Sequence, residues 1–232
     1  MDNSKFNGIY FQNTSTGWIC GYNNNNVHGI IYKTTDSGVT WKLNFTSTYD
    51  ERFYKIFFLN SDYGFVGSGT SLFKTTNGGV NWLIVNFLSR SIDFDMVDSL
   101  NIIFAGGYTI GSTSHGTIIK TTNGGINLTT QLNILDTVIL SVDFINSNTG
   151  FVCGQRGKII KTSNFGSNWT TMQSGVYTNL NSINFLNLTT GFSAGISGVI
   201  IKSINSGNEW DLKTKGTLFR NLTSSYFLNE LT

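Results

Sequence analysis

Residues 74–82 read KTTNGGVNW, and four variants of this phrase recur along the 232-residue chain. They are KTTDSGVTW at 33–41, KTTNGGINL at 120–128, KTSNFGSNW at 161–169 and KSINSGNEW at 202–210. The lysines that open the five phrases are 41, 46, 41 and 41 residues apart. Because one phrase returns at a nearly constant period, the chain is predicted to be a repeat protein.

Two further phrases precede the lysine in each unit. One is short, apolar and ends in glycine, and it stands at 16–21, 63–67, 101–106, 149–154 and 190–195. The other is an apolar stretch ahead of it, such as KIFFLN at 55–60. Each unit is therefore predicted to hold four short strands, A to D, with strand C ending at the lysine phrase and strand D beginning at its tryptophan. A period of about 40 residues with four strands is typical of a β-propeller blade.

We predict one all-β propeller domain over residues 1–232 with essentially no helix. Its blades are expected at about 5–48, 49–87, 88–134, 135–175 and 176–216. Residues 217–232 are expected to open a sixth blade, because 219–229 again read as strand A. The chain is thus predicted to be five blades plus the first strand of a sixth, part of a larger propeller that could be seven-bladed.

The turn between strands C and D has a residue-by-residue explanation. An Asp or Asn at its start is expected to hydrogen-bond the backbone two residues on, and the Gly two positions later supplies a positive φ. The Trp is expected to pack the next strand against its neighbour. Asp36 is the acid of the first turn, asparagines replace it elsewhere, and Leu128 replaces the third Trp. The residues predicted to form these turns are Asp36, Gly38, Trp41, Asn77, Gly79, Trp82, Asn123, Gly125, Asn164, Gly166, Trp169, Asn205, Gly207 and Trp210.

The turn phrase resembles the Asp-box, or bacterial neuraminidase (BNR) repeat. The fuller phrase at 72–82 is similar to the blades of the photosystem II assembly factor family. This resemblance implies a propeller and a non-catalytic, protein-binding scaffold, and some family members use an arginine-rich patch on an acidic partner. Sialidases also resemble the chain through the Asp-box, but their Arg-Ile-Pro motif is absent because the chain has no proline. A sialidase-like glycoside hydrolase whose catalytic residues lie outside this chain is the alternative.

Composition excludes several other classes of function. A net charge of +2 without a Lys/Arg run argues against nucleic acid as a partner. No stretch approaches the roughly 18 apolar residues of a membrane span. Cys20 and Cys153 have no nearby His at ligand spacing and occupy the same place in the repeat as alanines, so we expect core residues and no metal site. No cofactor loop or catalytic set is found, and the chain is predicted not to be an enzyme.

The candidate binding face is the one that holds the B–C turns and the D–A connections. Lys5, Arg52 and Arg90 occupy equivalent positions, eight residues before Asn13, Asn60 and Asp98, and they are expected to form a positively charged crescent. Asp50 and Glu51 are interpreted as a surface loop. We expect this face to bind a protein or peptide, with ordinary solvated charges as the alternative. Its candidate residues are Lys5, Arg52, Arg90, Arg156, Arg220, Tyr49 and Tyr108.

The low charge and the Asn/Thr/Gly-rich composition also favour an exported bacterial protein, extracellular or periplasmic. The opening residues Met1-Asp2-Asn3-Ser4 do not read as a signal peptide. Export is therefore expected from composition and from the resemblance.

Overall fold

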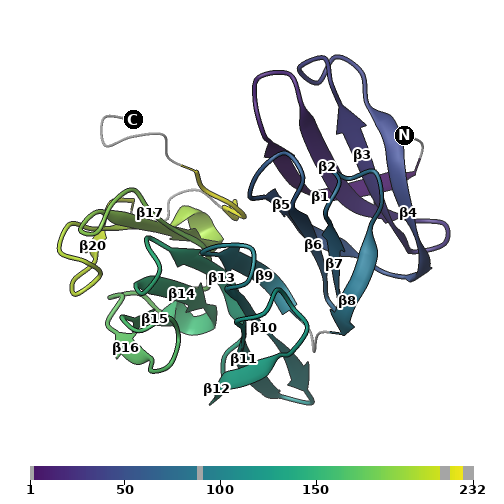
Figure 1. The fold of residues 1–232 in the computed structure, drawn as a ribbon. Helices are drawn as coiled ribbons and strands as arrows, with labels where there is room; N and C mark the ends of the chain where they lie inside the picture. Colours follow the sequence, from purple (N-terminus) through teal and green to yellow (C-terminus); the bar gives the residue numbers. More distant parts are fainter. Residues whose placement is uncertain (1–2, 88–90, 215–219, 227–232) are drawn as a thin grey trace. The chain divides into compact units, whose positions relative to one another are not determined.

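The computed structural model describes residues 3–87, 91–214 and 220–226, and their regular structure is almost entirely β (Figure 1). Strands pair into five antiparallel four-stranded sheets, each built from strands that follow one another in the chain. Helical geometry within these residues is limited to two three-residue 3-10 turns, Gln155–Gly157 and Ile196–Gly198. The predicted all-β architecture of four-stranded units is confirmed.

The five sheets are called blades 1 to 5 below. Blade 1 contains β1 (Ser4–Phe11), β2 (Gly17–Asn23), β3 (His28–Thr34) and β4 (Lys42–Asp50). Blade 2 contains β5 (Phe53–Phe58), β6 (Gly64–Ser68), β7 (Ser71–Thr75) and β8 (Leu83–Phe87). Blade 3 contains β9 (Ser91–Met96), β10 (Ile102–Ile110), β11 (Thr113–Thr121) and β12 (Thr129–Leu135). Blade 4 contains β13 (Ile139–Phe144), β14 (Gly150–Gly154), β15 (Ile159–Thr162) and β16 (Thr170–Met172). Blade 5 contains β17 (Leu180–Phe185), β18 (Gly191–Gly195), β19 (Ile200–Ser203) and β20 (Asp211–Leu212).

The chain forms two compact units. The first consists of residues 1–92, 98–100 and 123–127, and the second of residues 93–97, 101–122 and 128–232. Blades 1 and 2 belong to the first unit, and blades 4 and 5 to the second. Each unit is described by itself.

In the first unit, the core lies between the facing sheets of blades 1 and 2. Successive side chains of a strand point to opposite faces, so one face of blade 1 can present its apolar residues to blade 2. Trp18 of blade 1 stacks on Phe58 of blade 2 with ring centroids 3.9 Å apart, and Trp82 closes on Phe58 edge-on at 5.7 Å. Cys20 and Ile31 belong to the same cluster. Cys20 is therefore a core residue, as expected.

The second unit repeats this arrangement. Phe151 of blade 4 stacks on Phe185 of blade 5, again at 3.9 Å, and Trp210 meets Phe185 edge-on at 5.8 Å. Cys153 lies fully buried in this cluster. The blade-to-blade contact is thus built from the same repeat positions in both units, which explains why the sequence keeps an aromatic residue at each of them.

In the C–D turns, the glycines have the predicted positive φ, but the Asp or Asn that opens each turn makes a longer-range hydrogen bond than predicted. Gly38 has φ +86°, and Ser37 before it has φ +62°. Asp36 Oδ1 accepts from the N–H of Thr40, four residues on rather than two. The hydrogen bond that spans two residues is made instead by the hydroxyl of Thr34, whose Oγ1 accepts from the N–H groups of Asp36 and Gly38. The amide oxygens of Asn77, Asn123, Asn164 and Asn205 make the same four-residue bond.

The lysine of this phrase links one blade to the next. Lys33 Nζ donates to the carbonyl oxygen of Gly78 at 3.1 Å. Lys120 and Lys161 donate to the carbonyl oxygens of Phe165 and Ser206, both at 2.8 Å. Partial burial lowers the pKa of Lys120 and Lys161. The sequence marked these lysines only by their recurrence, and their role in joining neighbouring turns comes from the structure.

The described part of the predicted sixth-blade strand, residues 220–226, lies along β17. Leu222 N–H donates to the Gly195 carbonyl at 3.1 Å, and Asn181 Nδ2 donates to the Leu222 carbonyl at 2.7 Å. Asn7 Nδ2 makes the equivalent bond to the Phe53 carbonyl between blades 1 and 2. The segment therefore takes the place of a strand A without forming a regular strand, because no strand B pairs with it among the described residues. Residues 219 and 227–229 of the prediction lie outside those described.

Candidate functional site

The register of blade 1 brings its B–C turn and its D–A connection to one edge. Ser4 at the start of β1 pairs with Asn23 at the end of β2, and His28 at the start of β3 pairs with Asp50 at the end of β4. Residues 24–27 and 51–52 consequently lie at the same edge of the sheet. The candidate residues Lys5 and Arg52 belong to this edge.

Lys5 and Arg52 meet around the ring of Tyr22. Lys5 pairs with Tyr22 across β1 and β2, and its Nζ lies 6.0 Å from the ring centroid. Arg52 Cζ lies 5.0 Å from the same centroid. The negative face of an aromatic ring attracts both cations, which offsets their mutual repulsion. We call these three residues the Tyr22 cluster. The contact of both cations with one tyrosine ring comes from the structure, which pairs Lys5 with Tyr22 and brings Arg52 over the same ring.

The interpretation of Asp50 and Glu51 as a surface loop is wrong for Glu51. Its side chain is buried, and its carboxylate accepts hydrogen bonds from the hydroxyls of Thr70, at 2.8 Å, and Ser71. Its N–H donates to the Val27 carbonyl at 3.0 Å. Glu51 therefore ties the D–A connection to the β6–β7 turn of blade 2. A carboxylate is tolerated there because hydroxyl donors replace the water it loses.

The other charged and aromatic residues at this edge of the first unit are more exposed than Glu51. Asp50 is exposed, and His28 Nε2 lies 3.8 Å from its Oδ1. Tyr49 is exposed near the end of β4. Arg90, the third residue of the predicted crescent, lies outside the described residues, so the crescent itself stays a prediction.

In the second unit, Arg156 occupies the tip of the B–C turn of blade 4. Its backbone is left-handed, with φ +56°, and its N–H donates to Asn179 Oδ1 at 3.1 Å. This conformation is uncommon for a residue other than glycine. Arg156 and Arg220 are both exposed. Tyr108 pairs with His115 across the β10–β11 hairpin and stacks on its ring at 4.9 Å.

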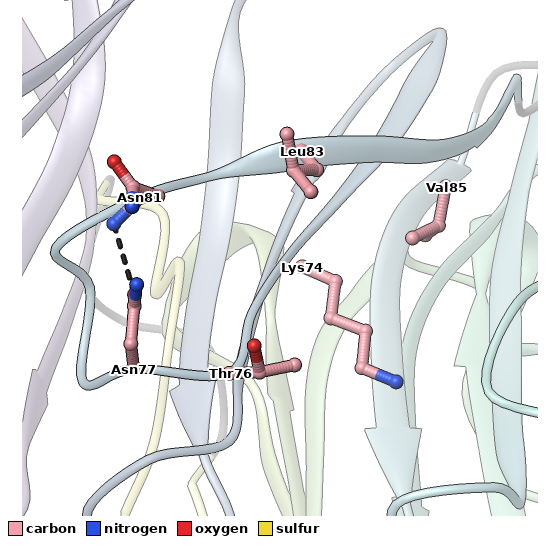
Figure 2. A pocket seen from close by; sticks show the side chains of 6 residues that line it. All are labelled: Lys74, Thr76, Asn77, Asn81, Leu83 and Val85. Carbon is pink, nitrogen blue, oxygen red and sulfur yellow. Dashed lines mark hydrogen bonds between the residues drawn. The ribbon is translucent and has the colours of Figure 1, made fainter.

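A shallow pocket of about 180 Å³ lies beside strands β7 and β8 of blade 2 (Figure 2). Its lining consists of Lys74, Thr76, Asn77, Asn81, Leu83 and Val85. Lys74 Nζ lies over the rings of Tyr63 and Phe65, at 5.3 and 5.5 Å. This lining contains no carboxylate, so the pocket lacks the paired acids of a glycoside hydrolase. Its amide and lysine groups suit hydrogen bonding rather than acid–base chemistry.

The described residues contain no group of three or more His, Cys, Asp and Glu side chains placed to hold a metal ion. The two cysteines are fully buried, and this burial raises the pKa of both thiols. A thiol held in this way is a poor nucleophile. In the part of the chain that the structure describes, no helix is long and apolar enough to cross a membrane.

Comparison with known proteins identifies the family. The model of the photosystem II assembly factor YCF48 family, described as "Photosynthesis system II assembly factor YCF48", matches residues 2–134 and 128–218. The chain belongs to the YCF48 family. The resemblance drawn from the repeat phrase is therefore confirmed. A search of curated proteins finds no match.

Solved structures show the same fold at low sequence identity. YCF48 from Cyanidioschyzon merolae is 15% identical with TM-score 0.54, and the comparison covers 98% of this chain and 90% of that one. A structure described as YCF48 bound to D1 peptide gives 15% identity, TM-score 0.52 and coverage of 98% and 88%. The Niastella koreensis GH74 enzyme gives 21% identity and TM-score 0.71, with coverage of 90% of this chain and 38% of that one. Our chain thus spans well under half of the GH74 enzyme.

Proposed function

We propose that this member of the YCF48 family is a non-catalytic protein-binding propeller. We further propose that the edge formed by its B–C turns and D–A connections captures an acidic segment of another protein. The Tyr22 cluster carries this proposal, because it brings two cations to one tyrosine ring at that edge. Among the described residues, neither Lys5 nor Arg52 forms an ion pair with an acidic side chain. Both are exposed and available to a partner's carboxylates.

The chemistry of the cluster fits a carboxylate-bearing peptide. The planar guanidinium of Arg52 can pair with a carboxylate through two parallel hydrogen bonds. Tyrosine and arginine are also the residue types that most often anchor protein interfaces. The structure of YCF48 bound to D1 peptide supports a peptide as the kind of ligand. The position of the binding face is our inference from the cluster.

A charge-reversal pair tests the face. Arg52→Glu reverses a cation of the cluster, while Lys42→Glu makes the same change at the opposite edge of blade 1, where Lys42 pairs with Lys33. An exposed charge pair contributes about 0.2–1 kcal/mol, and reversal replaces one attraction by one repulsion. We therefore expect Arg52→Glu to raise the Kd for a fluorescent D1 peptide about fivefold to tenfold at low salt, and less at high salt. Lys42→Glu should bind like the unchanged chain.

Two results would count against the proposal. Equal Kd values for Arg52→Glu and Lys42→Glu would remove the Tyr22 cluster from the binding face. An unchanged chain that binds no D1 peptide even at low salt would remove the support for a peptide ligand. A melting temperature measured for each variant serves as the control for folding, and all three should agree because both substituted residues are exposed.

A glycoside hydrolase is the second candidate, because the GH74 enzyme superposes on this chain. Such enzymes need two carboxylates on opposite sides of a sugar bond. Glu51 is unsuited to that role, since its carboxylate is buried against two hydroxyls. Hydrolysis of a fluorogenic glycoside by the purified chain would favour this candidate, and we expect none.

A further inference from the structure

Arg52 stands between two residues that burial holds in place. Glu51 is 6% exposed, and Phe53 is fully buried in the core between blades 1 and 2. Phe53 also pairs with Ser68 of β6, and its carbonyl oxygen accepts from Asn7 Nδ2 at 2.8 Å. The main chain is therefore held on both sides of Arg52, which fixes the point from which its side chain starts.

Glu51 joins the B–C turns of two blades. Its N–H donates to the carbonyl oxygen of Val27 at 3.0 Å, in the B–C turn of blade 1. Val27 has φ +57°, which is a costly conformation for a β-branched residue, and the bond to its carbonyl helps to hold it. The Glu51 carboxylate accepts from the hydroxyls of Thr70, at 2.8 Å, and Ser71, at the B–C turn of blade 2.

The turn that receives the carboxylate has internal bonds of its own. Ser68 Oγ accepts from the N–H groups of Thr70, at 3.1 Å, and Ser71, at 2.8 Å. It also donates to the Ser71 carbonyl oxygen at 3.2 Å. All of these residues belong to the first unit. Two hydroxyl donors on a hydrogen-bonded turn thus define the position of the Glu51 carboxylate.

We propose that Glu51 is a positioning residue for Arg52, and that its bonds to the two turns hold the guanidinium over the ring of Tyr22. This inference rests on the proposed function, since it describes how the Tyr22 cluster is kept in place for a partner's carboxylate. Arg52 Cζ lies 5.0 Å from the Tyr22 ring centroid. A side chain that is already held in its binding position loses less conformational freedom when a partner binds.

NMR of the free protein tests the position of Arg52. The chain has four arginines, so their Nε–H signals are few, and Arg52→Lys identifies the one that belongs to Arg52. The ring current of Tyr22 shifts this signal, and Tyr22→Leu gives its value without the ring. We expect Glu51→Ala to move the Arg52 signal most of the way to that value. Glu51→Gln should leave it near its original place, because an amide can still hydrogen-bond both hydroxyls.

Ser71→Ala and Thr75→Val form a matched pair. Ser71 and Thr75 are the first and last residues of β7, and both are 1% exposed. Ser71→Ala removes a donor to Glu51, whereas Thr75→Val removes a hydroxyl that bonds within the C–D turn of blade 2. Both variants should melt at a lower temperature than the unchanged chain. Only Ser71→Ala should move the Arg52 signal toward its value without the ring.

Two NMR results would overturn the inference. The Arg52 signal could stay in place in both Glu51→Ala and Ser71→Ala, or it could move equally in Ser71→Ala and Thr75→Val. The second result would indicate a general loss of structure instead of a positioning role. If Glu51→Ala does not fold, the comparison of Ser71→Ala with Thr75→Val decides.

Peptide binding separates this inference from the proposed function. Glu51→Ala should raise the Kd for D1 peptide roughly twofold to tenfold, because Arg52 must then be ordered on binding. An unchanged Kd would overturn the positioning role in binding. An unchanged chain that binds no D1 peptide would contradict the proposed function, while the NMR comparison would still decide whether Glu51 positions Arg52.

Discussion

Phe58 and Phe11 occupy the same place in the repeat, and replacing each by alanine should separate burial from sequence position. Phe58 packs between Trp18 and Trp82, with ring centroids 3.9 and 5.7 Å away. Phe11 keeps the edge-on contact with the tryptophan of its own blade, Trp41, but has no stacked ring from a preceding blade among the described residues. The same substitution should therefore have different costs in blades 1 and 2.

The magnitudes follow from the two environments. Truncation of a fully buried phenylalanine costs about 3–5 kcal/mol, part of it from the cavity left behind. Phe58→Ala loses a stacked pair as well, so we expect a cost of about 4 kcal/mol. Phe11 buries about three fifths of its surface and leaves no closed cavity, so Phe11→Ala should cost about 1.5–2 kcal/mol.

Urea unfolding followed by tryptophan fluorescence measures this difference. With a slope of about 2 kcal/mol per M, the midpoint of Phe58→Ala should lie about 1 M below that of Phe11→Ala. Equal midpoints for the two variants, or a lower midpoint for Phe11→Ala, would refute the reasoning that the preceding blade and not the repeat position determines the cost.

Three further predictions concern single turns and thiols. Gly207→Ala should destabilise the protein more than Gly38→Ala in thermal melts: both positions have φ near +80°, but a Cβ at Gly207 would lie 2.4 Å from Phe151 Cε1, against 3.6 Å for the nearest atom at Gly38. Hydrogen bonds from the Thr40 hydroxyl and amide and from the Thr34 hydroxyl hold the pKa of Asp36 at about 2, below its ordinary 3.8. The stabilisation of the folded state by the Asp36 carboxylate is therefore present above the ordinary pKa and is lost as pH falls through about 2. The melting temperatures of the unchanged chain and Asp36→Asn should converge at that pH. A difference in melting temperature that stays constant with pH would contradict this. Cys20 and Cys153 should react with a thiol reagent only after unfolding, because burial raises the pKa of both. Rapid labelling of the native protein would show that their cores open readily.

The C–D turns were predictable in part because their interactions are local. The glycine at the third place of each turn has positive φ in all five blades, as its residue type indicates. The residue before it also has positive φ, and in blade 4 that residue is Phe165. Phenylalanine rarely adopts this conformation, so no rule of residue type predicts it. The surrounding hydrogen bonds, with Thr162 Oγ1 accepting from the N–H of Gly166, stabilise the turn despite that preference.

The candidate site was predictable only where it follows the repeat. Counting from the strand A asparagines placed Lys5 and Arg52 at equivalent positions, and the structure brings both to Tyr22. Glu51 was misplaced because it stands in a run of three charged residues, Asp50 to Arg52, which is typical of a surface loop. Its burial depends on Thr70 and Ser71, which belong to the next blade and carry no signal in the residues around Glu51.

The sequence by itself determined the repeat, the four strands of each blade and the chemistry of the turns, because these depend on residues within one period. Only the tertiary structure decided which lysine joins which turn, which carboxylate is buried and which sheet face is covered. Ile9 and Ile56 illustrate the reason: they are the same residue at the same place in the repeat, yet one is mostly exposed and the other buried. Burial is a property of what packs against a side chain, and the packing partner comes from a different blade.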